Sequence, residues 1–158
     1  MEIYIRPLQA ADALVSYAWR NDPVVWKYTG SRPDREITPE IEMAWIQQVL
    51  ARENEKRYAI CLAADNTYIG NVQLTHISSG SAEFHIFIGA RAYWGMQLGY
   101  KATKLMLEKG TEELKLEQIF LDVSTENTAA VKAYIKCGFE IVNELGSTYR
   151  MVYKRMVL

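Results

Sequence analysis

Short stretches in which hydrophobic and polar residues alternate predict β-strands along much of this chain. Neighbouring side chains of a strand point to opposite faces of the sheet, so alternation gives one apolar face and one polar face. Two of these stretches are separated by the turn-forming run 64–67, which predicts a hairpin. The predicted strands cover residues 3–6, 58–63, 68–77, 82–88, 118–124, 139–144 and 148–157.

Other stretches carry apolar residues at every third or fourth position, which predicts amphipathic helices. Between the first two of them, residues 24–39 are polar and contain Gly30, Pro33 and Pro39, so we expect a long irregular loop suited to substrate selection. Gly138 is expected to end the last helix, because glycine adopts a left-handed conformation without steric cost. The predicted helices cover residues 8–20, 41–49, 98–114 and 128–137.

The order of these elements predicts the α+β class: a mixed, mostly antiparallel central sheet of about seven strands flanked by about four helices. The first half of the chain is rich in hairpins, whereas the second half alternates strands with helices. A length of 158 residues and a hydrophobic content of 49% suit a compact unit with a sizeable core. We therefore predict a single domain over residues 1–158.

Charge, hydrophobicity and cysteine spacing indicate which partners and which cellular setting are expected. The chain carries 18 basic and 19 acidic residues, a net charge of -1, which argues against a large nucleic-acid-binding face. No apolar run is long enough to span a membrane, and residues 1–6 lack the apolar stretch of a signal peptide. Cys61 and Cys137 show no metal-ligand spacing, so we expect no metal site and a reducing, cytoplasmic setting.

A glycine-punctuated turn, Trp94–Gly99, joins the predicted strand at 82–88 to the helix that begins near residue 98. Such a turn can present several backbone N–H groups and the positive end of a helix dipole to a phosphate. Taken alone the signal is weak, because a short turn with glycine serves equally well to change the direction of the chain.

A second segment follows the next predicted strand. Residues 124–127 read Ser-Thr-Glu-Asn, and a helix that carries Tyr134 then runs into Gly138 and Phe139. Together with the turn at 94–99, this segment closely resembles the GCN5-related N-acetyltransferase (GNAT) superfamily. The resemblance extends over most of the chain, but only these two segments are specific.

The acetyl-CoA loop of that superfamily reads Gln or Arg, two residues, Gly, one residue, and then Gly or Ala. Trp94, Gln97 and Gly99 stand at its three defining positions in this chain. Gln97 departs from the family, which normally has glycine at the central position. If the backbone of Gln97 approaches a pyrophosphate, its side chain has to turn outward.

The resemblance implies a GNAT-type fold and acetyl-CoA as the co-substrate. Backbone N–H groups of residues 96–100 would bind the pyrophosphate, and the backbone of Phe87 and Ile88 would pair with the pantetheine arm. Asn127 and Tyr134 fall on one stripe of a helix, so both can face one ligand. The implied cofactor-binding residues are Phe87, Ile88, Trp94, Gly95, Met96, Gln97, Leu98, Gly99, Tyr100, Asn127 and Tyr134.

By residue type alone, Asn127 is more typical of a helix N-cap, and Tyr134 of a packed core aromatic. Their places in the family pattern favour contact with the cofactor. A phenol with a pKa of about 10 stays protonated at neutral pH and can donate to a departing thiolate, whose thiol has a pKa of about 8.5. Tyr134 is therefore our candidate general acid.

The amine that attacks the acetyl group must first lose a proton. Glu83 and His85 share the polar face of the strand at 82–88 and are the candidate general bases, with Asp122 on the neighbouring strand as a third. The alternative is that they form a partly solvated sheet face. Five basic residues could meet the phosphates or be ordinary surface charges: Arg91, Lys101, Lys104, Lys132 and Lys136.

The sequence narrows the reaction more than the acceptor. Residues 18–25 resemble the opening of acetyltransferases that modify protein N-termini, polyamines or nucleotide-linked amino sugars. We predict N-acetyl transfer to a primary amine of a small molecule, such as a nucleotide-linked amino sugar, or of a protein N-terminus. Aromatic faces suit sugars and cations, so the candidate acceptor residues are Trp26, Tyr28, Trp45 and Tyr93.

Two further points stay open at this stage. The chain could be a non-catalytic regulatory module that binds acyl-CoA with the same fold, with Gln97 as the sign of lost turnover; Asn127 and Tyr134 argue against this alternative. Exposed terminal strands are compatible with a homodimer. The partners expected are acetyl-CoA and an amine acceptor, without nucleic acid or membrane.

Overall fold

A computed structural model describes residues 1–155 of the chain; the side chains of Tyr28 and Thr29 lie outside this description, as does the predicted strand beyond residue 155. Short 3-10 turns, η1 (Ala10–Asp12) and η2 (Arg91–Tyr93), precede α1 and the loop before α4. The other elements are β1 (Ile3–Pro7), α1 (Ala13–Asn21), α2 (Pro23–Thr29), α3 (Pro39–Leu50), β2 (Lys56–Leu62), β3 (Tyr68–Ser78), β4 (Ser81–Ile88), α4 (Leu98–Glu112), β5 (Gln118–Ser124), α5 (Thr128–Cys137), β6 (Glu140–Leu145) and β7 (Thr148–Lys154).

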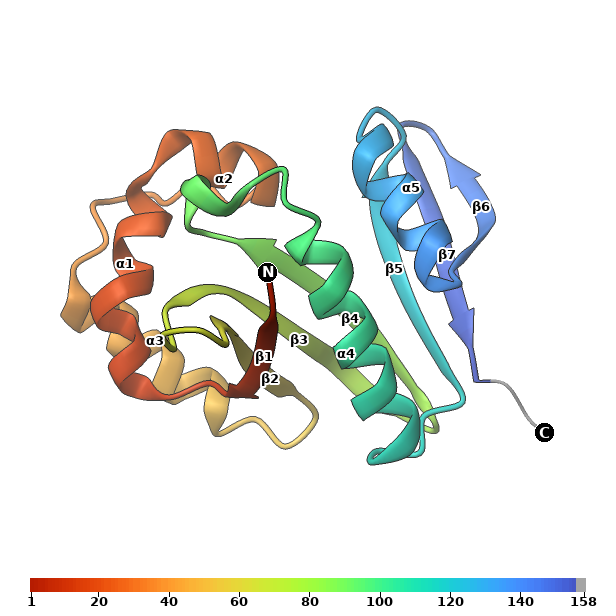
Figure 1. Cartoon of the computed structure of the whole chain (residues 1–158), viewed down its shortest axis with the longest axis horizontal. Helices are drawn as coiled ribbons and strands as arrows, with labels where there is room; N and C mark the ends of the chain where they lie inside the picture. Colours follow the sequence, from red (N-terminus) through yellow and green to blue (C-terminus); the bar gives the residue numbers. More distant parts are fainter. Residues whose placement is uncertain (156–158) are drawn as a thin grey trace.

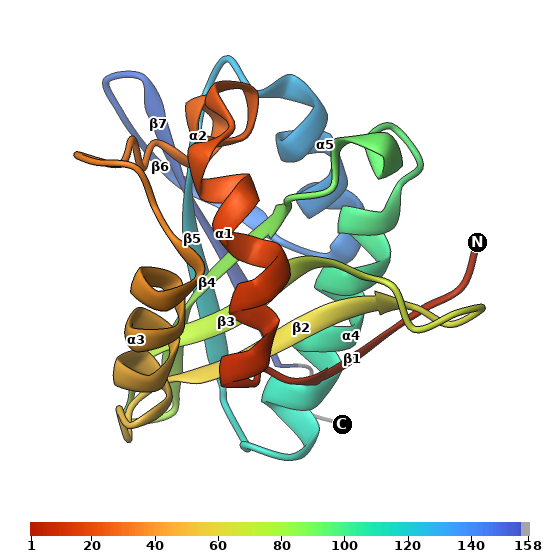
Figure 2. The ribbon, with the colours of Figure 1, turned by 90° about the vertical axis from the view of Figure 1, so that its left-hand side faces the viewer.

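The strands form one seven-stranded sheet in the order β1-β2-β3-β4-β5-β7-β6. Every neighbouring pair is antiparallel except β4 and β5, which run parallel. Helices α1 and α3 lie against one face of the sheet, and α4 lies against the other face beside α5 (Figures 1 and 2). This arrangement confirms the predicted α+β class and the mixed, mostly antiparallel sheet. None of the helices described here is long and apolar enough to cross a bilayer.

The sheet separates two apolar clusters, because alternate side chains of each strand point to opposite faces. On the α4 side, Ile60 of β2 packs in the same cluster as Met106 of α4. On the α1 and α3 side, Ala59 belongs to a second cluster. Strand β4 follows the predicted alternation, since Phe84 joins the first cluster and Phe87 packs against the second.

Strands β4 and β5 separate after three residue pairs. They pair only where Ser81–Glu83 face Gln118–Phe120, and beyond this point the two strands diverge (Figure 1). On its β5 side, the edge of β4 over residues 84–88 therefore has no strand partner among the described strands. A free strand edge exposes backbone N–H and C=O groups with which another extended group can pair.

Residues 23–29 are helical, so the described part of the chain has five α-helices rather than about four, and the prediction of a loop there was wrong. The Asp22 carboxylate accepts the N–H of Val24 at 3.0 Å and caps the helix. Pro23 occupies the first helical position, where its missing N–H costs nothing. Gly30 ends the helix with φ 72°. Seven residues are too few to show a helical period in the sequence.

Gln97 begins α4 in a conformation that favours glycine. It is the N-cap residue, with φ 60° and ψ 21°, and its side chain makes no capping hydrogen bond. Gly95, two residues earlier, also has a positive φ of 77°. The left-handed region costs a residue with a Cβ roughly 1–2 kcal/mol. Gln97, which stands where the family pattern has glycine, therefore carries backbone strain.

Replacing Gln97 by glycine should raise the free energy of unfolding by about 1 kcal/mol, because glycine adopts this conformation without a steric penalty. Gln47→Gly is the matched control, since Gln47 is exposed within the regular helix α3. That control should lower the free energy of unfolding by about 1 kcal/mol. Urea denaturation measures both variants, and a loss of stability in both would contradict the assignment of strain to Gln97.

Candidate active site

Two cavities open beside the divergence of β4 and β5. The first, of about 680 Å³, is lined by the end of β4, the loop before α4 and one side of α5. The second, of about 710 Å³, is lined by residues of α1, α2 and α3, by residues of β2 to β5, and by Asn127 and Tyr134 at α5. The cavities meet, because the same five residues line both: Val25, Ile86, Phe87, Asn127 and Tyr134.

The loop before α4 forms one wall of the first cavity. Trp94 ties this loop to the end of β4, because its indole Nε1 donates a hydrogen bond to the carbonyl of Ile88 at 2.7 Å. A Cβ added to Gly95 or Gly99 would meet no atom within 4 Å, so the wall is open at both glycines. The first N–H groups of a helix have no intrahelical partner. This wall therefore suits a phosphate group.

The structure brings the predicted cofactor-binding residues to the first cavity with one exception. Phe87, Ile88, Trp94, Gly95, Gln97, Leu98, Gly99, Tyr100, Asn127 and Tyr134 all line it. Met96 does not; its side chain is exposed on the outside of the loop. Only the backbone of Met96 can contribute to the phosphate wall.

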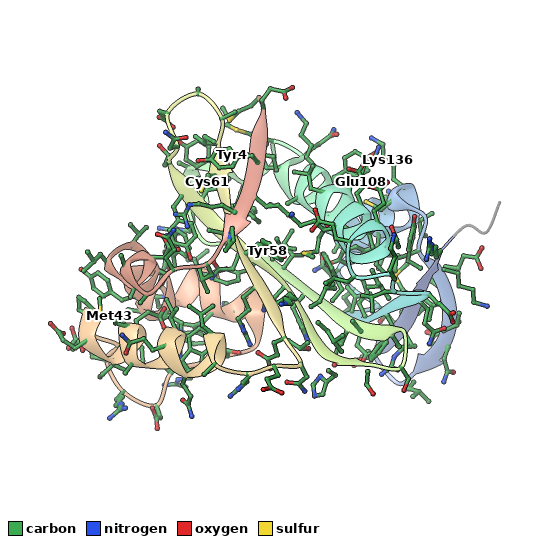
Figure 3. The ribbon with its side chains drawn as sticks, turned by 90° about the horizontal axis from the view of Figure 1, so that it is seen from below. Tyr4, Met43, Tyr58, Cys61, Glu108 and Lys136 are labelled. Atoms are coloured by element: carbon green, nitrogen blue, oxygen red, sulfur yellow. The ribbon has the colours of Figure 1, made fainter. Side chains whose placement is uncertain are left out.

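The five basic residues predicted near the phosphates divide into two groups. Lys132 and Lys136 line the first cavity, and the Nζ of Lys136, which is labelled in Figure 3, lies 4.4 Å from the centroid of the Tyr100 ring. The others do not line it: Arg91 pairs with the Asp22 carboxylate at 3.0 Å, Lys101 donates to the Met1 carbonyl at 2.7 Å, and Lys104 lies 5.7 Å from the Tyr100 ring.

Tyr134 lies where the two cavities meet. Its ring packs edge-on against Phe84 of β4, with centroids 6.1 Å apart, and against Phe139, with centroids 5.6 Å apart. Burial raises the pKa of Tyr134 to about 12, so the phenol is protonated at neutral pH. Its hydroxyl has no hydrogen-bond partner among residues 1–155, which leaves it available to a ligand.

Asn127 is both a helix cap and part of the cavity wall. Its Oδ1 accepts the N–H of Ala130 at 3.3 Å at the start of α5. This bond engages the oxygen of the amide, whereas the amide nitrogen has no hydrogen-bond partner among residues 1–155 and can donate to a ligand. Capping and ligand contact are therefore compatible at Asn127.

The polar face of β4 carries a small cluster of titratable groups. The Glu83 carboxylate lies 3.4 Å from Nε2 of His85 and 3.2 Å from Nδ1 of His76. His85 lines the second cavity, whereas Glu83 lines neither cavity. Desolvation lowers the pKa of His85, with the charge of Arg57 acting in the same direction and that of Glu83 opposing it. At neutral pH the His85 imidazole is thus neutral and able to accept a proton.

Asp122, the third candidate base, lies in the second cavity but is engaged elsewhere. Arg150 of β7 donates two hydrogen bonds to its carboxylate, at 2.6 and 3.0 Å. This pairing lowers the pKa of Asp122. A carboxylate held by an arginine is a weak base, so the geometry disfavours Asp122 for proton removal.

Aromatic residues from three helices surround the second cavity. Trp26 and Trp45, both predicted for the acceptor site, line this cavity together with Trp19. Tyr93 lines the first cavity instead. The side chain of Tyr28 lies outside the described residues.

The sequence analysis gave no functional role to five polar residues that line the second cavity, Arg20, Arg52, Glu55, Arg57 and His76. His76 has φ 51° at an irregularity of β3, which brings it beside Glu83. Alternation at the start of β2 marks Glu55 and Arg57 as one polar face, but the convergence of α1, α3 and β2 has no local signal in the sequence. In residues 1–155, no three His, Cys, Asp or Glu side chains gather as metal ligands would.

Comparison with known proteins agrees with this geometry. Residues 2–140 match the family model of the acetyltransferase (GNAT) domain. Spermidine N(1)-acetyltransferase of Escherichia coli K12 is 29% identical over 145 residues, which cover 90% of this chain and 75% of that protein. An uncharacterized protein of Methanocaldococcus jannaschii is 24% identical over 141 residues, and this match covers 88% of the chain but only 28% of that protein's length.

The fold also matches a solved structure. Spermidine N-acetyltransferase from Vibrio cholerae, in complex with CoA and spermine, superposes with a TM-score of 0.85 and 24% sequence identity, over 96% of this chain and 95% of that one. At this identity the match supports the fold, whereas the family model over residues 2–140 supports the family. The chain therefore belongs to the GNAT family of acetyl-CoA-dependent N-acetyltransferases.

Proposed function

We propose that this chain, acting as a single domain over residues 1–158, transfers the acetyl group of acetyl-CoA to a primary amine of a small molecule or a protein N-terminus. The observation that carries the proposal is that two cavities, one for each substrate, meet at Tyr134 and Asn127. The Escherichia coli and Vibrio cholerae relatives are named for acetylating spermidine, which supports an amine as the acceptor.

The first cavity is the proposed acetyl-CoA site. The wall at Gly95 and Gly99 and the N-terminus of α4 would face phosphate, with Lys132 and Lys136 adding positive charge. The free edge of β4 over residues 84–88 would pair with the amides of the pantetheine arm. Acetyl-CoA supplies the acetyl group as a thioester, which an amine can attack.

The second cavity would bring the amine to the point where the cavities meet. His85 lines it as a neutral imidazole, so it is the proposed general base, acting directly or through water. Tyr134 is the proposed general acid for the leaving thiolate, because its phenol stays protonated and has no competing partner. The Glu83 carboxylate, 3.4 Å from Nε2 of His85, would orient the imidazole and stabilise its positive charge once it has accepted the proton.

A Tyr134→Phe variant should lower kcat by about 10²-fold, the contribution typical of a positioned acid. It should keep the fold and the affinity for acetyl-CoA, because the ring contacts with Phe84 and Phe139 remain. Tyr153→Phe on β7 is the matched control outside both cavities and should keep wild-type kcat. Unchanged turnover in Tyr134→Phe would show that Tyr134 is not the general acid.

Tight acetyl-CoA binding by the wild type without turnover of any amine would favour the alternative function, a non-catalytic module that binds acyl-CoA.

The pH dependence separates the two candidate bases. His85 accepts a proton only when neutral, so kcat/KM should rise through an acid limb whose pKa lies below the ordinary value of about 6.5. Glu83 favours the charged imidazole, so Glu83→Gln should move that limb to still lower pH. His85→Gln should abolish the limb and lower kcat by at least about 10²-fold. If Glu83→Gln abolishes the limb while His85→Gln keeps it, Glu83 is the base.

We also propose a cellular location and an oligomeric state for the protein. A cytoplasmic setting suits Cys61 and Cys137, which are both unpaired thiols in the structure. A homodimer through the edge strand β6 suits its exposed apolar side chains, Ile141, Val142 and Leu145. Sedimentation of the purified protein distinguishes a dimer from a monomer.

A further inference from the structure

One carboxylate in the second cavity is shared by two arginines. Glu55 accepts hydrogen bonds from Nε and Nη2 of Arg57 at 2.9 and 2.8 Å, and from Nη1 of Arg52 at 3.1 Å. These bonds hold the pKa of Glu55 below its ordinary value, although desolvation opposes them. The group carries two positive charges and one negative charge. Nη1 of Arg57 and Nε and Nη2 of Arg52 have no hydrogen-bond partner in the part of the chain that the structure describes.

A third arginine lies beside this pair. The guanidinium carbons of Arg20 and Arg57 lie 5.3 and 5.2 Å from the ring centroid of Trp45. Arg20 donates to the buried Glu42 carboxylate at 2.9 Å, but its own Nε is buried without a partner among residues 1–155. Trp45 therefore gathers two guanidinium groups at one end of the cavity, and this end offers several unused N–H donors.

The charges that line the second cavity favour an anion over a cation. They comprise three arginines, Arg20, Arg52 and Arg57, and two carboxylates, Glu55 and Asp122. The buried Glu42 carboxylate balances the charge of Arg20, so the excess is the one positive charge of the group formed by Arg52, Arg57 and Glu55. Both carboxylates are already paired with arginine, Glu55 as described and Asp122 with Arg150. A polyamine, which is a polycation at neutral pH, would find no unpaired carboxylate among the residues that line this cavity and would meet one uncompensated arginine charge.

Strand register gives the separation between Arg57, at one end of the second cavity, and His85, the proposed general base. Arg57 of β2 faces Gln73 of β3, which faces His85 of β4, so the three side chains form one row across the same face of the sheet. Two strand spacings separate Arg57 from His85, which is roughly 10 Å. An anionic group held at Arg57 would thus lie about this distance from the amine that His85 deprotonates.

We propose that the acceptor is an amine that also carries an anionic group, a phosphate or a carboxylate, bound by Arg52 and Arg57 at the far end of the second cavity. This inference rests on the proposed acetyl transfer and specifies its substrate class. Free guanidinium N–H groups match the oxygens of either anion, and the roughly 10 Å row sets the span between anion and amine. On this account the chain differs in acceptor from its spermidine-acetylating relatives.

Matched pairs of amines test the inference by coenzyme A release. Glucosamine 6-phosphate and glucosamine differ only in a phosphate on the side of the ring opposite the amine. Trialanine and its C-terminal amide differ only in a carboxylate at the far end of the peptide. We expect at least one anionic member to exceed its neutral partner by about tenfold or more in kcat/KM, and spermidine to be poorer than that member. The pair that shows the preference identifies phosphate or carboxylate.

Variants of Arg52 and Arg57 test whether these residues cause the preference for the anionic amine. Arg52→Gln and Arg57→Gln should each reduce the ratio of kcat/KM for the anionic amine to kcat/KM for its neutral partner by about tenfold, through KM for the anionic amine. Arg155→Gln, an exposed arginine outside the second cavity, is the matched control and should keep the preference. Acetyl-CoA affinity, measured by calorimetry, confirms that each variant is folded. Arg52 is half-exposed and joined to one carboxylate, so its variant serves even if Arg57→Gln fails to fold.

Different results would contradict the proposed acceptor class and the proposed acetyl transfer. Preference for spermidine over every anionic probe, or an anionic preference that both arginine variants retain, would overturn the inference and leave acetyl transfer intact. Release of coenzyme A with none of the amines, spermidine included, would contradict the proposed function itself.

Discussion

The site depends on one constraint, the parting of β4 and β5 after three residue pairs. A sheet that stayed paired would bury the edge of β4 and close the space between the two faces. Aromatic packing holds the opening at its base, because Phe84, Tyr134 and Phe139 contact one another there with ring centroids 5.6 to 6.1 Å apart. Tyr134 thus has a structural role in the opening, in addition to its proposed role as general acid at the junction of the two cavities.

The two faces of the sheet present different polar groups to the cavities beside the opening. On the α4 face, backbone N–H groups at the start of a helix and Lys132 and Lys136 present fixed positive charge at the cavity wall. On the α1 and α3 face, guanidinium and carboxylate groups pair around tryptophan rings. Between them, environment moves two pKa values in opposite directions, raising that of Tyr134 and lowering that of His85. Such a separation is typical of an acid and a base that act in one reaction.

Much of the fold was predictable from the sequence because the relevant signals are local. Alternation placed β4, and Gly138 ended α5 with φ 108° as expected. The glycine-containing loop and Tyr134 could be assigned because a family pattern covers them. Helix α2 was missed, since it depends on a cap at Asp22 and a stop at Gly30 rather than on periodicity.

The residues that line the second cavity were less predictable, because they come together only through strand register and packing. Arg57 and His85 are far apart in the chain and become neighbours in one row through β3. The strain at Gln97 likewise appears only once the start of α4 is fixed at a positive φ. A loop that tolerates this strain in the folded protein retains the shape that glycine would give it.

Calorimetric titration of acetyl-CoA into the wild type and a Gly99→Leu variant tests whether the opening beside β4 is the acetyl-CoA site. A Cβ added at residue 99 meets no atom within 4 Å, so the variant should fold, and the rest of its leucine side chain should project into the cavity that residue 99 lines. Glu112→Leu, exposed at the end of the same helix, is the control. We expect the wild type and the control to bind acetyl-CoA, and Gly99→Leu to lose at least about tenfold in affinity. Equal affinity in all three proteins would contradict the assignment of this opening to acetyl-CoA.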